Sequence, residues 1–310
     1  MSSIAYITDH QMIEYHRLNG NRMINFWKPS TMKKISDFKK GDYLFFLAKG
    51  TEKGEKKEKG IVGYGKLEKM YTMTFSQMWD KFETKNGYST KEALEEAITK
   101  ITKTHEIPEY LNCFQLEEVT FFQAPLYLSE IGMEISNKIE SYIYIDKTDV
   151  QNTSKILQLA NNVGMDMWSA LFHKENDSIF IKDAQINFIQ NICQKVKTNI
   201  YSHYEETRIQ KYCKKIITDH QKMISKTEFI DVQKDMISIF IPCLINVGDY
   251  FNLKLQYCIG HYILYESYIK MSEFVNEIEV VILFNKEVDK KTIELLKINN
   301  IKYKEKLVNE

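Results

Sequence analysis

The order of elements between residues 205 and 304 is the feature that most constrains how this chain can fold. A helix pattern at 205–220 is followed by apolar strands at 229–232 and 236–241, a helix at 253–270, a strand at 279–284, a helix at 290–299 and a strand at 301–304. Strands that alternate with helices are typical of an α/β unit. The second half of the chain is therefore predicted to be an α/β domain.

The first half is richer in strands. Strands are predicted at 4–8, 41–48, 60–65, 112–122 and 141–145, and helices at 75–82, 89–103 and 153–160. Ser89 or Thr90 would cap the second helix. The glycines of the strand at 60–65 predict a β-bulge or a close approach of another backbone segment. This half is predicted to be a separate, mainly β domain.

Charge and length limit the function. A chain of 310 residues is long enough for two domains. Its 42 basic and 42 acidic residues cancel, so a nucleic-acid site would have to be a local patch. Between Lys33 and Lys69 there are 11 lysines against 6 acidic residues. Within that stretch, the mixed-charge loop at 49–60 is better explained as a solvated hairpin tip than as a phosphate contact.

The five cysteines are widely spaced, and the absence of a Cys-x-x-Cys pair argues against a structural zinc site. The N-terminus has no signal-peptide pattern, and no run of about 18 apolar residues could span a bilayer. We therefore expect a cytoplasmic protein with reduced thiols and no membrane partner.

A set of segments in the first half carries a family signal. Asn25-Phe-Trp-Lys-Pro29 is followed by Phe38-Lys-Lys-Gly-Asp-Tyr-Leu-Phe-Phe46, Gly60-Ile-Val-Gly-Tyr-Gly65, Asn86-Gly-Tyr88 and a stretch from Phe121 to Gly132. In order and spacing these segments resemble the EVE-like branch of the PUA superfamily over residues 1–150. The resemblance implies a small β-barrel flanked by helices that binds nucleic acid, in many members by flipping a modified base into an aromatic pocket.

The resemblance also implies candidate site residues. A flipped base needs aromatic faces to replace its lost stacking. The predicted base pocket consists of Asn25, Phe26, Trp27, Ser30, Tyr64 and Tyr71, with Trp27 as the first choice for a stacking wall. Predicted contacts to the nucleic-acid backbone are Lys28, Lys33, Lys34, Lys66 and Lys69. The alternative for Phe26 and Trp27 is that both are core residues.

The second half resembles the PD-(D/E)XK nuclease fold over about residues 184–304. The helix with Leu255-Gln-Tyr-Cys-Ile-Gly-His-Tyr-Ile-Leu-Tyr265 resembles the helix that follows the active-site strand. That strand, 237–243, places Ile241 and Cys243, or Phe240 and Pro242, where the family carries Glu-x-Lys. The resemblance therefore implies a nuclease frame without its usual metal site. Pro242 also predicts a strand that lies at an edge or ends there.

Other charged residues of this half could replace the missing Glu-x-Lys only in part. Asp231 and Glu206 are residual candidates for catalysis, and Asp231 for a metal; Asp249, Glu266 and Lys254 could also have taken over roles. One pair of metal ligands without the lysine is a poor catalyst. No catalytic residue or cofactor is assigned, and Mg²⁺ is expected only if the chain is an active nuclease.

Together these patterns predict an α+β protein: an EVE/PUA-like β-barrel reader at 1–150, a connector at 151–183 and a restriction-endonuclease-like α/β domain at 184–310. The predicted function is recognition of a modified base in duplex DNA, of restriction or antiviral-defence type, with homodimerisation through the C-terminal domain as a further option. The alternatives are an active Mg²⁺-dependent DNA endonuclease and an RNA-binding PUA-like protein.

Overall fold

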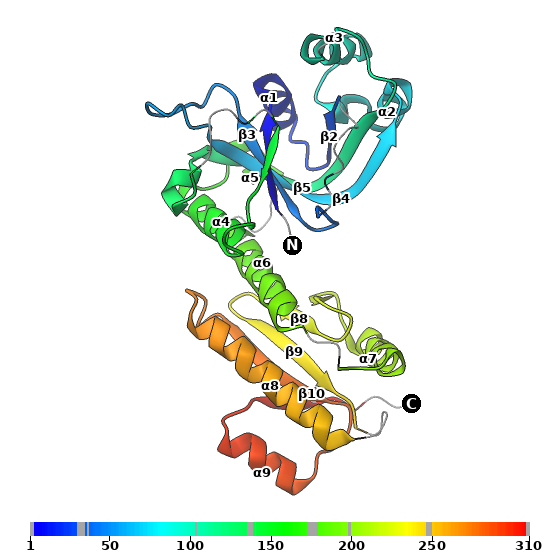
Figure 1. Ribbon diagram of the computed structural model, residues 1–310, viewed down its shortest axis with the longest axis vertical. Coiled ribbons are helices and arrows are strands. Elements are labelled where there is room, and N and C mark those ends of the chain that lie inside the picture. The colour runs from blue at the N-terminus through cyan, green and yellow to red at the C-terminus, as the bar shows by residue number, and fades with distance from the viewer. Residues whose placement is uncertain are drawn as a thin grey trace. The chain divides into compact units, whose positions relative to one another are not determined.

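The computed structural model describes residues 3–29, 35, 37–102, 104–134, 139, 141–172, 179–197, 200–245 and 250–307 (Figure 1). The chain forms two compact units, residues 1–187 and 188–310, and the division falls within one helix, α6 (Ile179–Val196). The segment at 151–183, expected to be a connector, instead belongs to unit 1, because α4 (Asn152–Val163), α5 (Met167–Phe172) and the start of α6 pack there.

The described strands of unit 1 form a six-stranded sheet of order β2-β5-β4-β3-β1-β6. Its strands are β1 (Ile4–Thr8), β2 (Ile24–Lys28), β3 (Tyr43–Ala48), β4 (Ile61–Met73), β5 (Leu111–Leu126) and β6 (Tyr142–Tyr144). All neighbours are antiparallel except β1 and β3. The sheet curls strongly, since Phe26 on the edge strand β2 lies with its ring centroid 5.0 Å from that of Tyr6 on β1.

Helices cover both faces of this sheet. They include α1 (His10–Leu18), α2 (Phe75–Phe82), α3 (Lys91–Ile101) and the 3₁₀ turns η1 (Glu83–Asn86) and η2 (Leu128–Ile131). The predicted helices at 75–82 and 89–103 are confirmed, and Thr90 caps α3 by accepting from the backbone N–H of Ala93. Helix α1 and strand β2 were not predicted. Asp9 caps α1, whose buried face is Met12, Ile13 and His16.

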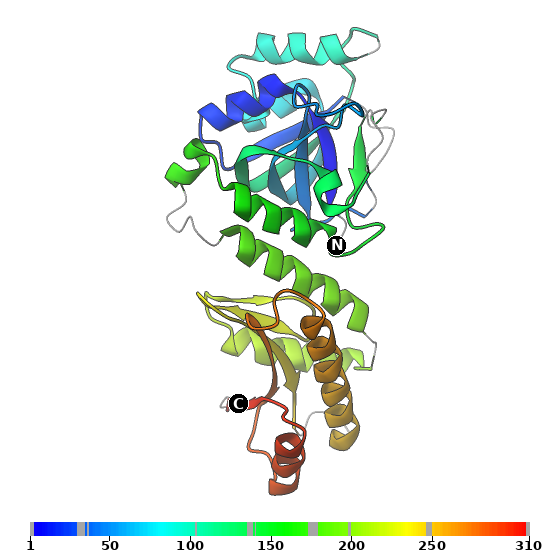
Figure 2. The ribbon, with the colours of Figure 1, turned by 90° about the vertical axis from the view of Figure 1, so that its left-hand side faces the viewer.

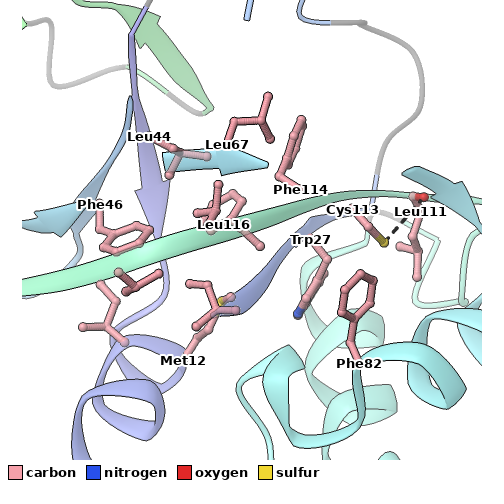
Figure 3. Packing of buried hydrophobic residues seen from close by; sticks show 14 of the residues in the cluster. Met12, Trp27, Leu44, Phe46, Leu67, Phe82, Leu111, Cys113, Phe114 and Leu116 are labelled. Atoms are coloured by element: carbon pink, nitrogen blue, oxygen red, sulfur yellow. Dashed lines mark hydrogen bonds between the residues drawn. The ribbon is translucent and has the colours of Figure 1, made fainter. Parts of the chain in front are cut away.

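The concave side of the curled sheet holds an aromatic core. Phe46, Phe114 and Phe121 pack there with Phe26, and Figure 3 shows Phe46 and Phe114 beside Leu44, Leu67 and Leu116. A strand with apolar residues at every position is expected to be buried on both faces. Strand β3 is buried along its whole length, as its near-continuous apolar sequence predicted.

The outer face of the sheet carries a buried ionic cluster. Tyr64 on β4 donates its hydroxyl to Asp183 on α6 at 2.7 Å, and the Lys66 ammonium donates to the same carboxylate at 2.7 Å and to Glu118 at 2.5 Å. Burial and the neighbouring Asp183 both raise the pKa of Tyr64, so it stays protonated. The cluster fixes the first turns of α6 to the sheet.

Unit 2 contains a mixed sheet of order β11-β10-β9-β8-β7 in its described residues. The strands are β7 (Gln221–Met223), β8 (Phe229–Val232), β9 (Ile237–Cys243), β10 (Ile278–Phe284) and β11 (Tyr303–Glu305); the helices are α7 (His203–Ile216), α8 (Phe251–Lys270) and α9 (Lys290–Ile298). β9, β10 and β11 are parallel, and β7, β8 and β9 are antiparallel. The predicted strand–helix order is confirmed here.

The two long helices of unit 2 cover opposite faces of its sheet (Figure 2). On one face Ile209 and Tyr212 of α7 pack with Phe229, Phe240 and Val281. Strand β9 lies between β8 and β10 and is not at an edge, so the second alternative predicted from Pro242 holds, that the strand ends there. Pro242 is tolerated because the pairing with the short strand β8 stops at Phe240, and the strand ends one residue after the proline.

Replacing the central carboxylate of the unit 1 cluster tests its role. Asp183→Ala should lower the free energy of unfolding by about 3–5 kcal/mol, because it leaves the Lys66 charge and the Tyr64 hydroxyl buried without their partner. Denaturant unfolding would measure this. The exposed pair of Glu96 and Lys100 supplies a control, since Glu96→Ala should change little. Equal effects of the two substitutions would contradict the assignment.

The buried carboxyl group of Asp146 predicts that the stability of the fold depends on pH. Burial raises the pKa of Asp146 to about 6, from 3.8, although Thr153 donates two hydrogen bonds to it. Between pH 3.8 and about 6, the folded state therefore binds more protons than the unfolded state. Stability from this group is fully present below about pH 4 and is lost as pH rises through 6, by roughly 3 kcal/mol. Asp146→Asn should remove that decline, so unfolding curves of wild type and variant that stay parallel from pH 4 to 7 would contradict it.

Candidate nucleic-acid interface

The residues predicted to form one base pocket lie in separate environments. Phe26 points into the aromatic core. Asn25 and Trp27, its neighbours on β2, are held by Asn86: the Asn25 amide donates to its side-chain oxygen at 2.8 Å and the Trp27 indole N–H to its carbonyl at 3.0 Å. Trp27 is only 8% exposed and lies toward Phe82 (Figure 3). The indole is therefore packed in a layer beneath α2 and η1.

The two predicted tyrosines lie far apart along β4. Tyr64 is fully buried in the cluster with Asp183. Tyr71 shares a face with Trp27, since both pair with Cys113 on β5, one from each side. Its ring is half-buried against Phe82, at 5.8 Å between centroids. Ser30 lies outside the described residues. Of the predicted pocket aromatics, only Tyr71 is both described and accessible.

Of the three predicted backbone-contacting lysines that the structure describes, two are buried or paired. Lys28 is 6% exposed, and burial lowers the pKa of its ammonium. Lys66 is held by Asp183 and Glu118. Lys69 is exposed, with its ammonium 5.2 Å from the centroid of the Tyr71 ring. Lys33 and Lys34 lie outside the described residues.

Unit 1 has a cavity of about 150 Å³ between α1 and the ends of β3, β4 and β5. Its apolar wall comprises Ile13, Ala48, Val62, Phe121, Phe122, Ala124 and Pro125, and its polar groups are His10, Glu14, Arg17, Thr51 and Gln123. An apolar cavity of roughly this volume holds a ring the size of benzene. The site is thus large enough for a single planar ring with polar groups at the rim.

Arg17 is the best-oriented polar group of the cavity. Its Nε donates to Asp166, which is buried, and one terminal nitrogen donates to Glu14 at 3.1 Å. Asp166 is itself fixed, because its backbone N–H donates to the Phe121 carbonyl and its carboxylate accepts from the Ser169 N–H. These bonds hold the guanidinium plane and leave further N–H groups for a ligand. A held arginine suits planar recognition of a base edge or a phosphate.

Sequence reasoning missed this site. His10, Ile13, Glu14 and Arg17 follow the three- and four-residue spacing that places side chains on one helical face. That spacing could have indicated this face of the helix from the sequence. The partner Asp166 could not have been found in this way, since it lies 149 residues from Arg17 in sequence.

The acidic candidates of unit 2 are not gathered into one site. Asp231 accepts from the Gln221 side chain at 2.9 Å, and Glu206 pairs with Lys226 at 2.9 Å. Two of the substitutes also have partners: Lys254 pairs with Glu205 at 2.5 Å and Glu266 with Lys270 at 3.5 Å. Asp249 lies outside the described residues. Within the described ranges, no three His, Cys, Asp or Glu side chains lie close enough to hold a metal ion.

Unit 2 contains a buried acidic residue that is not among these candidates, Glu228. Glu228 precedes β8 and accepts from the Tyr265 hydroxyl at 2.8 Å and from the Cys193 thiol at 3.4 Å; its other oxygen lies 3.1 Å from Nδ1 of His261. His261 and Tyr265 stand one turn apart on α8. His261 is buried, at 5% exposure. The network ties α6, β8 and α8 together within unit 2.

All five cysteines are buried and none forms a disulfide. No helix in the described part of the chain is long and apolar enough to cross a membrane.

Comparison with known proteins gives only structural likeness. No family model and no curated protein sequence matches the chain. Crystal structures of an ASCH protein from Zymomonas mobilis are similar to about half of this chain. The unmutated protein has 11% identity and a TM-score of 0.35, and the match covers 49% of this chain and 94% of the ASCH chain. Two mutants of that protein, one with 12% identity and a TM-score of 0.37 and the other with 11% and 0.36, each match 51% of this chain, and 99% and 95% of their own chains. At TM-scores below 0.5 this likeness carries no argument, and the candidate site rests on the contacts described above.

Proposed function

We propose that unit 1 binds nucleic acid and takes one base, in the favoured case a modified base of duplex DNA, into the cavity between α1 and β3–β5. The observation that carries this proposal is the combination of a ring-sized apolar cavity with a guanidinium held at its rim by Asp166 and Glu14. The EVE-like order of motifs in residues 1–150 supports the same function. We therefore place the base site beside α1, and not at Trp27, the first choice from the sequence.

The chemistry of the cavity suits an extruded base. Flipping a base out of a duplex costs a few kcal/mol of lost stacking and pairing, and apolar and aromatic contacts must offset this cost. Phe121 and Val62 supply such contacts, while Arg17 can donate to ring nitrogens or exocyclic oxygens of the base edge. His10 and Gln123 at the rim would distinguish a modified from an unmodified base.

Unit 2 is proposed to be a nuclease-like module without standard catalysis, serving to clamp DNA or to pair with a second copy. The strand–helix order of unit 2 supports an alternative, that unit 2 is a Mg²⁺-dependent endonuclease. In that alternative Asp231→Ala abolishes metal-dependent cutting of modified duplexes, whereas in the favoured account wild type and variant leave the duplex intact on a gel. Competition between RNA and duplex DNA of equal length separates the remaining alternative, an RNA-binding protein.

Filling the cavity provides the direct test of unit 1. Val62→Phe places a larger side chain in the space proposed for the base and leaves the Arg17–Asp166 pair intact. We expect the Kd for modified duplex to rise by about 5- to 150-fold, since losing the ring contacts costs about 1–3 kcal/mol. Fluorescence anisotropy with matched modified and unmodified duplexes measures this.

Ile101→Phe is the control, because Ile101 is 56% exposed at the end of α3 in unit 1, does not line the cavity and also receives a larger side chain. Its Kd should equal that of wild type. A thermal melt of both variants checks that folding is preserved. If folded Val62→Phe binds modified duplex as tightly as wild type, the cavity is not the base site.

A further inference from the structure

We propose that nucleic acid bound by unit 1 makes a second contact near the other end of β4, where Lys69, Tyr71 and Lys81 bind its phosphodiester backbone. This inference rests on the proposed function and names a surface apart from the cavity. Val62 lines the cavity at the start of β4, and Lys69 and Tyr71 lie near the end of the same strand. One strand therefore joins a base site to a backbone site.

In the patch, two lysine ammonium groups lie close to one aromatic ring. The Lys81 ammonium, from α2, lies 4.9 Å from the Tyr71 ring centroid, and the Lys69 ammonium lies 5.2 Å from it. Lys81 also lies 5.5 Å from the ring of Phe82. The Tyr71 hydroxyl donates to the Gln115 side chain at 3.1 Å, which fixes the ring on the sheet. Both ammonium groups thus lie beside the same fixed ring.

The charges of the patch are not neutralised by carboxylates. Elsewhere in unit 1, exposed lysines pair with acids, as Lys40 does with Glu68 and Lys56 with Glu134. Among the described residues, neither Lys69 nor Lys81 takes part in an ion pair, although Asp80 and Glu83 are close to Lys81 in sequence. Two cations that share one aromatic ring repel each other. A bound phosphate relieves this repulsion and releases counterions from the nucleic acid.

The partner follows from this chemistry. Lysine ammonium groups bind phosphate as point charges and do not read base sequence. Cation–π contact with Tyr71 holds both lysines near the ring without neutralising them. The patch therefore adds affinity equally for modified and unmodified nucleic acid, whereas the cavity supplies the discrimination.

Salt dependence tests the patch. The Kd of the full chain for a duplex should be measured between 50 and 200 mM NaCl for wild type and for the double variant Lys69→Gln/Lys81→Gln. Each lost phosphate contact lowers the slope of log K against log salt by about 0.9, so the slope should become shallower by about 2. Binding should weaken by the same factor for modified and unmodified duplexes. Both lysines are exposed, so thermal stability should hold.

Lys56→Gln/Lys100→Gln removes the same charge from two exposed lysines of unit 1 that pair with Glu134 and Glu96, and it serves as control. An unchanged slope for the Lys69/Lys81 variant, or an equal change in the control, overturns the patch. If duplex binding stays sensitive to Val62→Phe while the slope is unchanged, the patch fails and the proposed function stands. If wild type binds no nucleic acid at all, both proposals fail.

Discussion

The long pairing of β4 with β5 is the constraint on which unit 1 depends. These strands have 13 and 16 residues, and the register shifts at three places along them. β-bulges of this kind bend a strand pair and increase its twist. One shift lies between Ile61 and Gly63, where an added Cβ would lie 2.5 Å from the Thr120 carbonyl oxygen. The glycine thus allows the close backbone approach that the sequence predicted.

The bent pair places the functional groups. β3 joins one side of it and β2 the other, so the sheet can curl around the aromatic core. At one end Val62 and the residues from Phe121 to Pro125 line the ring-sized cavity under α1. Near the other end Lys69 and Tyr71 meet Lys81. Burial of Lys66 with Asp183 keeps that lysine structural, and leaves these two exposed cations for a ligand.

Sequence patterns predicted elements better than they predicted the site. Apolar segments of the right length sufficed for the helices α7, α8 and α9 and for strands β8, β9 and β10, because each buries apolar side chains in unit 2. Helix α1 was missed because its buried face combines Met12 and Ile13 with the polar His16. The residues predicted for the base pocket are dispersed for a different reason. Phe26 and Trp27 are neighbours on β2 and point to opposite faces, and the partners that hold Asn25, Arg17 and Tyr64 lie 61, 149 and 119 residues away in sequence.

The central claim is that α1 and the end of β5 receive a base, and amide hydrogen exchange of the full chain with and without a modified duplex tests it most directly. The account predicts slower exchange in His10–Leu18 and at residues 121–125 on binding, because the bound base shields these groups. Slower exchange confined to residues 188–310, with α1 unchanged, would contradict it.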